Sequence, residues 1–127
     1  MHKAMYALAA AAAVALAAPA HAASHIVDIA WGPDGAFVHR ANVDPGKFVE
    51  VCGRLDPGAA IRWGFEASAP VDFNIHYHVG KEVEFPAKQA QVSAGHDTLR
   101  VAVREDYCWM WSNKSSGRVQ IDISLRR

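Results

Sequence analysis

The sequence predicts an all-β fold, an antiparallel β-sandwich of about eight strands. Three observations lead to this prediction. Beyond residue 25, apolar and polar side chains alternate with the period of two that is typical of half-buried strands. Turns that contain proline and glycine separate the alternating segments. No segment beyond the N-terminal run repeats with the period of a helix, so that helical fold classes are disfavoured.

The N-terminus has the three parts of a secretory signal. His2 and Lys3 form a short basic region, residues 4–18 are an uncharged apolar run, and Ala20 and Ala22 occupy the small-residue positions of a cleavage site. The apolar run is too short to span a hydrocarbon core of about 30 Å. We therefore expect residues 1–22 to be removed, and residues 23–127 to form one periplasmic or secreted domain with no membrane span.

The alternation places each strand in order along the chain. We expect strands at residues 26–31, 37–40, 49–55, 61–66, 71–79, 99–103, 107–111 and 119–125, with turns at 32–35, 44–46 and 56–58. The alternation is clearest in 71–79, where His76 and His78 fall on the outward face. Trp109 and Trp111 fall on the inward face of their strand and are predicted to belong to the core.

Charge and composition exclude several functions. The 13 basic and 13 acidic residues are interspersed, whereas a nucleic-acid-binding face needs a clustered basic stripe. No basic amphipathic helix is present to lie on a membrane surface. The sequence also lacks a nucleophile elbow and a phosphate-binding glycine loop, and its carboxylates give no pair that can be placed in a cleft, so we do not expect an enzyme.

Two cysteines, Cys52 and Cys108, lie in the predicted domain. In an oxidising compartment, two cysteines of a small domain usually pair. A disulfide that closes a loop of about 55 residues contributes ~4 kcal/mol in the chain-entropy model. A disulfide between them would also remove the two thiolates as metal ligands, and with them a blue-copper site.

Several segments together resemble the GOLD domain, the lumenal β-sandwich of eukaryotic secretory-pathway cargo receptors. They are an early strand with a cysteine at 49–52, a strand at 71–75, the segment Tyr-Cys-Trp-Met-Trp-Ser-Asn at 107–113 and a last strand at 118–125. The resemblance implies a β-sandwich, a Cys52–Cys108 bridge and a role in protein interaction. No transmembrane or coiled-coil segment follows the domain, so cargo transport is not implied.

A hairpin is predicted from strands 71–79 and 82–85. If the apolar side chains of both strands share one face, Tyr77 pairs with Val83 and Ile75 with Phe85. This register requires a three-residue connection, residues 79–81. On the other face, two imidazoles then meet two carboxylates in cross-strand pairs, namely His78 with Glu82 and His76 with Glu84.

The outward face of this hairpin predicts a metal site, because imidazole is a preferred ligand of copper and zinc. The candidate ligands are His76, His78, Glu82 and Glu84, with copper preferred over zinc, and Met110 as a further thioether ligand. The other interpretation is that opposed histidines and glutamates form surface ion pairs, each worth ~0–1 kcal/mol. A third is a GOLD-like module that binds an envelope protein without metal.

The remaining histidines and the tryptophans are assigned lesser roles. His96 is expected in a solvated turn, and His39 on the surface of a strand. Cleavage after Ala22 would place His25 third in the exported chain, whereas cleavage after Ser24 would make it N-terminal and a chelator of copper through its amine and ring, so it is a minor candidate ligand. The four tryptophans are expected to be core residues rather than the lining of a pocket.

Overall fold

The computed structural model describes residues 9–15 and 25–127. Residues 9–15 have no regular secondary structure. Most of the predicted signal and its cleavage site lie outside the described residues, so their interpretation stays a prediction. Within the described ranges, no helix has the length and hydropathy that a membrane span requires.

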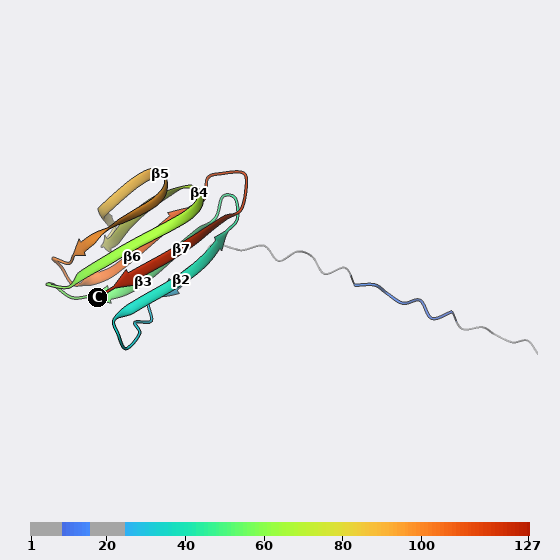
Figure 1. The fold of residues 1–127 in the computed structure, drawn as a ribbon, viewed down its shortest axis with the longest axis horizontal. Coiled ribbons are helices and arrows are strands. Elements are labelled where there is room, and N and C mark those ends of the chain that lie inside the picture. The colour runs from blue at the N-terminus through green and yellow to red at the C-terminus, as the bar shows by residue number, and fades with distance from the viewer. Residues whose placement is uncertain (1–8, 16–24) are drawn as a thin grey trace, which may run out of the picture.

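The fold is all-β, as predicted, with seven strands (Figure 1). The strands are β1 (His25–Asp28), β2 (Ala36–Val43), β3 (Phe48–Leu55), β4 (Ala60–Val79), β5 (Glu82–Arg100), β6 (Glu105–Ser112) and β7 (Val119–Arg126). They form a single curled sheet in the order β1-β3-β6-β4-β7-β2, with β5 paired to β4. All pairings are antiparallel except that of β1 with β3.

The long hairpin of β4 and β5 connects the two halves of the sheet. A strand has two edges, and β5 follows one edge of β4 over most of its length. The other edge is shared, because β7 pairs with residues 62–67 of β4 and β6 pairs with residues 72–76. One half of the sheet is therefore β2-β7-β4-β5, and the other is β1-β3-β6-β4-β5. We call their solvent-facing sides the β7 face and the β6 face.

The strand count differs from the prediction because two pairs of expected strands are continuous. Segments 61–66 and 71–79 are parts of β4, which is irregular between Glu66 and Val71, next to Pro70. Segment 82–85 extends through residues without alternation to the beginning of the expected strand 99–103, and both belong to β5, which ends at Arg100, so that residues 101–103 are not in a strand. Backbone pairing with β4 maintains this strand where its own side chains give no pattern, since β5 is largely exposed.

The core lies between the two halves of the curled sheet. Trp109 and Trp111 are fully buried, which confirms their predicted inward orientation. Phe73 of β4 packs at 4.8 Å from Trp63 and 5.4 Å from Trp111 between ring centroids. Of the four tryptophans, only Trp31 is partly exposed, and it packs against the edge of the core.

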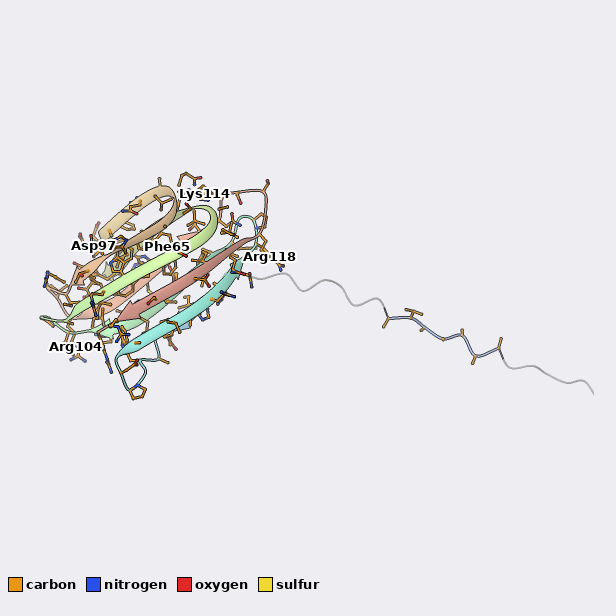
Figure 2. All side chains as sticks on the ribbon, viewed as in Figure 1. Phe65, Asp97, Arg104, Lys114 and Arg118 are labelled. Carbon is orange, nitrogen blue, oxygen red and sulfur yellow. A yellow bond between two sulfur atoms is a disulfide. The ribbon has the colours of Figure 1, made fainter. Side chains whose placement is uncertain are left out.

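The loops at the two ends of the strands are held by hydrogen bonds. The Asn113 side-chain amide donates to the Val43 carbonyl at 2.9 Å and to the Gly117 carbonyl at 2.7 Å, which connects the β2–β3 and β6–β7 loops. At the other end, the Tyr107 hydroxyl donates to the Val103 carbonyl at 2.8 Å. Figure 2 shows Lys114 and Arg118 at the first end and Arg104 at the second.

Candidate functional site

The β6 face carries the histidine cluster. Strand pairing aligns outward side chains in two neighbouring rows across β3, β6 and β4, and these rows are Cys52–Cys108–His76 and Glu50–Met110–Asn74. These positions point outward because their neighbours along each strand, such as Val49, Val51 and Trp109, are buried in the core. Six chemically varied side chains therefore share one patch of the sheet.

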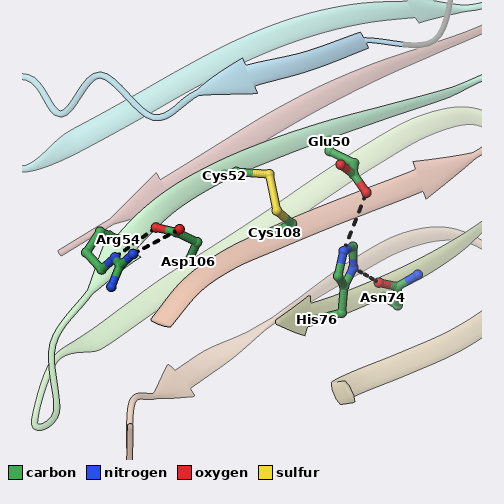
Figure 3. The surroundings of a disulfide bond; sticks show 7 residues. All are labelled: Glu50, Cys52, Arg54, Asn74, His76, Asp106 and Cys108. Carbon is green, nitrogen blue, oxygen red and sulfur yellow. Dashed lines mark hydrogen bonds and ion pairs between the residues drawn. A yellow bond between two sulfur atoms is a disulfide. The ribbon is translucent and has the colours of Figure 1, made fainter. Parts of the chain in front are cut away.

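The predicted disulfide is present on this face. Cys52 and Cys108 lie directly opposite each other on β3 and β6, and their sulfur atoms are bonded. The bridge closes a loop between residues 56 apart in the sequence. Figure 3 shows it between the Arg54–Asp106 ion pair on one side and the Glu50–His76 contact on the other.

His76 is the one buried histidine among the described residues, with 6 % of its surface exposed, although it points away from the core. Its Nδ1 lies 2.7 Å from Asn74 Oδ1, and its Nε2 lies 3.5 Å from Glu50 Oε1 (Figure 3). The ring of Phe85 on β5 lies 6.1 Å away between centroids and helps to cover it. The neighbouring β5 hairpin thus turns an outward position into a sheltered one.

Burial lowers the pKa of His76 below its ordinary value, despite the opposing effect of the Glu50 carboxylate, and the nearby His78 lowers it further. The imidazole is therefore neutral at pH 7. Asn74 Oδ1 is an acceptor, so Nδ1 carries the ring proton and donates it. In this tautomer Nε2 carries a lone pair and lies 3.5 Å from Glu50 Oε1, so the contact is not an ion pair at neutral pH.

The predicted hairpin register is wrong. The connection is a two-residue turn at Gly80 and Lys81, with Gly80 at φ 60°, so that His78 pairs with Val83 and Tyr77 with Glu84. A glycine at positive φ is favoured in such tight turns, whereas a three-residue loop would need a suitable residue at its end, where Lys81 stands. A bulge between Ile75 and Tyr77 then realigns the apolar residues, so that they share a face without the predicted register.

The structure consequently brings together only part of the predicted ligand set. His76 and His78 are adjacent, with ring centroids 5.3 Å apart, and Met110 lies on the same face. Glu82 and Glu84 pair with Val79 and Tyr77, so they lie on the opposite face of the hairpin from the histidines. The carboxylate near the histidines is Glu50 instead.

Glu50 was not predicted as a ligand, because it lies on β3, outside the predicted hairpin. Two signals in the sequence point to it. The alternation of Val49 and Val51 turns Glu50 outward, on the side of Cys52. If Cys52 and Cys108 are taken as opposed on antiparallel strands, the register also sets Glu50 against Met110.

Cys108 is not available as a metal ligand, and His39 and His96 lie outside the histidine cluster. Glu50, His76 and Cys108 have ligand-type atoms within 4.8 Å of one another, but Cys108 Sγ is in the disulfide. His39 is half-buried and stacks on Phe37 at 6.2 Å between ring centroids. His96 is exposed, as expected, but it lies within β5 rather than in a turn.

His25 lies on β1, with its ring 6.5 Å from that of His39 between centroids. It is remote in the strand order from the His76 cluster, because β3 and β6 separate β1 from β4. The structure therefore does not place this minor candidate ligand in the cluster.

The fold is that of a small all-β domain with one disulfide, and comparison with solved structures supports the β-sandwich architecture. The chain is similar to PliG from Aeromonas hydrophila, a periplasmic inhibitor of g-type lysozyme, with 10% identity, a TM-score of 0.58, and coverage of 82% of this chain and 96% of PliG. It is equally similar to the pre-peptidase C-terminal domain of a Bacillus anthracis collagenase, with 9% identity, a TM-score of 0.58, and coverage of 87% and 100%. No protein-family model and no curated protein matches the sequence.

Proposed function

We propose that this protein is an exported binding protein that takes up a transition-metal ion, copper for preference, between His76 and Glu50. The observation that carries this proposal is the pair of facing acceptors, Nε2 of a neutral imidazole and a carboxylate oxygen 3.5 Å away. Two acceptors in a sheltered place repel each other unless a proton or a cation lies between them.

The spacing of the two acceptors suits one metal ion. Ligand bonds of ~2.1 Å at a tetrahedral angle place two ligand atoms about 3.4 Å apart. The hydrogen bond from Nδ1 to Asn74 is the outer contact by which metal-binding histidines are usually oriented. The neutral state of His76 means that metal need not displace a proton from it at pH 7.

His78 and Met110 would complete the ligand set. The His78 ring is within 5.3 Å of the His76 ring, and Met110 lies between Glu50 and Asn74 in the strand register. Imidazole and thioether are ligands that suit copper, whereas zinc seldom takes a thioether. Copper is therefore preferred over zinc, and Glu82 and Glu84 are removed from the proposed ligands.

Titration calorimetry of the exported, oxidised protein with Cu(II) and Zn(II) tests the proposal. Cleavage after Ala22 would place His25 third, where its ring, the terminal amine and the intervening amides can chelate Cu(II), so the parent protein of this test and every variant carry His25→Gln. We expect micromolar or tighter copper binding that weakens at least tenfold in His76→Gln and in Glu50→Gln, a loss of about 1.4 kcal/mol or more. His96→Gln and Glu82→Gln are the matched controls and should bind like the parent.

Equal binding by His76→Gln and the parent would overturn the metal proposal. In that case the contact between His76 and Glu50 would belong to the packing of the β6 face and would not bind metal. Near-ultraviolet circular dichroism, which reports the packing of Trp109 and Trp111, verifies that each variant is folded.

A second candidate is an envelope module that binds a protein, which the GOLD resemblance implies. Its support is the fold similarity to PliG, a periplasmic lysozyme inhibitor, and the disulfide, which is typical of exported proteins. It predicts that a defined envelope protein co-purifies with the chain whether or not metal is added. Failure to retain any envelope protein after mild crosslinking would count against it.

A further inference from the structure

The β7 face is hollowed along the seam between β4 and β7. A groove of about 640 Å³ lies over Gly64 and Ser124, which face each other in the strand register. A second hollow of about 340 Å³ shares these two residues and extends the groove to Arg62 and Arg126. The larger hollow spans this half of the sheet from Val38 on β2 to His96 on β5, and the second hollow extends it along β4 and β7.

Each end of the groove has a pair of like charges. Arg62 lies directly opposite Arg126, and Glu66 lies directly opposite Asp122. Like charges opposed on neighbouring strands destabilise a sheet. Arg40 forms an ion pair with Asp122 at 2.6 Å. In the part of the chain that the structure describes, Arg62, Arg126 and Glu66 have no ion-pair partner, so both ends keep unbalanced charge.

The fold itself does not require the hollow between these charged ends. The backbone of Gly64 is not in the positive-φ region. A Cβ at Gly64 would lie 3.5 Å from the Gly95 carbonyl oxygen and 3.5 Å from His96 Cβ, which are ordinary contacts. A glycine within a strand weakens it and often marks a place where another chain approaches closely.

We propose that this groove binds an extended peptide segment of a partner protein, with an acidic and a basic side chain four residues apart. Arg62 and Glu66 are four residues apart on one strand, which corresponds to ~13 Å. In an extended peptide, residues i and i+4 point to the same side at this same spacing. The acidic side chain accepts hydrogen bonds from Arg62 and Arg126, the basic one pairs with Glu66, and the peptide backbone passes over Gly64.

Charge of both signs favours a peptide over other occupants. An inorganic anion or a phosphate group would use only the arginine end, and a cation only the end with Glu66 and Asp122. The proposal rests on the second candidate function, protein binding, for which it names a surface and a partner chemistry. It does not depend on the metal site, which lies on the β6 face.

Binding of short capped peptides tests the proposal. The probe is a fluorescent seven-residue peptide of threonine and alanine, with glutamate at its second position and lysine at its sixth. The control peptide has the same composition with glutamate and lysine adjacent. We expect the probe to bind at least tenfold more tightly than the control, with anisotropy as the readout and amide shifts confined to β2, β4, β5 and β7.

The double variant Arg62→Glu plus Glu66→Arg is the decisive change in the protein. It turns both like-charge pairs into opposite-charge pairs with Arg126 and Asp122, so the fold gains ion pairs while the groove loses its charge pattern. We expect a protein at least as stable as the parent that binds the probe at least tenfold more weakly. Lys47→Glu, at an exposed position of the β2–β3 loop, is the matched control and should bind normally.

Three results would overturn this groove as the peptide site. They are equal binding of both peptides, undiminished binding by the double variant, and competition by inorganic phosphate that is as strong as that of unlabelled probe. If an envelope protein still co-purifies with the double variant, the chain binds proteins by another surface. The failure of the groove and the failure of the protein-binding function are therefore distinguishable.

Discussion

The two outer faces of the sheet are organised in opposite ways. On the β6 face, several outward side chains complement one another, as in the disulfide and the two hydrogen bonds of 2.9 and 3.1 Å from Arg54 to Asp106. On the β7 face, like charges oppose each other across a glycine. The first arrangement stabilises the fold, whereas the second costs stability. This contrast indicates that stability and peptide binding depend on different halves of one small domain.

Removal of the disulfide is the largest change expected on the β6 face. In Cys52→Ala plus Cys108→Ala, the free energy of unfolding should fall by about 4 kcal/mol, because the unfolded chain regains the freedom of a long loop. Urea denaturation followed by tryptophan fluorescence measures the loss. Reduction of the parent protein should give the same loss, and a fall of less than about 1 kcal/mol in both would contradict the chain-entropy explanation.

Acid should weaken the same face through Asp72. Hydrogen bonds from Lys114 and from the side chain and backbone of Gln91 lower the pKa of Asp72 to about 2. An unfolded aspartate has a pKa of ~3.9, so this stabilisation is complete above about pH 5 and is lost as the pH falls towards 2. Because Lys114 is well exposed, solvent screening reduces the contribution to about 1–2 kcal/mol.

The variant Asp72→Asn measures this contribution. Its free energy of unfolding should be lower than that of the parent near neutral pH and should approach the parent value at about pH 2. A constant difference between Asp72→Asn and the parent across this range would exclude the titration of Asp72 as the cause.

On the β7 face, filling the groove should stabilise the protein. Gly64→Ala places a methyl group in ordinary contact with its neighbours and should raise the free energy of unfolding by about 0.5–1 kcal/mol. Gly95→Ala is the contrasting variant, because its Cβ would lie 2.9 Å from Phe65 Cε1, and it should destabilise. Thermal denaturation compares the two, and a destabilised Gly64→Ala would mean that the glycine serves the fold.

The smallest effect is expected from removal of the charge repulsion between Arg62 and Arg126. Arg62→Glu places a carboxylate opposite Arg126 and should stabilise the protein by about 0.2–1 kcal/mol at low salt. Both side chains are exposed, so the gain should shrink in concentrated salt, in which charges are screened over a few ångströms. Denaturation at two salt concentrations provides the measurement, and a salt-independent gain would indicate a packing effect instead.

The sequence predicted the sheet and the core well, because both depend on local alternation. The buried positions of Phe73, Ile75, Trp109 and Trp111 follow directly from period-two patterning. The extent of β5 could not be predicted in this way, since residues 86–98 owe their strand conformation to pairing with β4. Alternation describes a strand that packs on one side, and it says little about one that is exposed.

The candidate site was predicted only in part, because it depends on long-range pairing. His76 and His78 were correctly placed on the outward face, but their neighbours come from β3 and β6 as well as from the hairpin. A shift of one residue at the Gly80 turn moved Glu82 and Glu84 to the other face. The like-charge pairs of the β7 face are likewise visible only once β4 and β7 are known to pair.

The exposed edge of β5 has a consequence for self-association. In the described part of the chain, β5 pairs only with β4, so the backbone groups along its other edge are available to a strand of a second molecule. Such edges initiate aggregation unless they are interrupted. Here Pro86 lacks an N–H, the bulges opposite Val71 and Ile75 break the repeat, and Lys88 adds charge. The irregular pairing that obscured β5 in the sequence thereby makes this edge a poor template for a strand of a second copy.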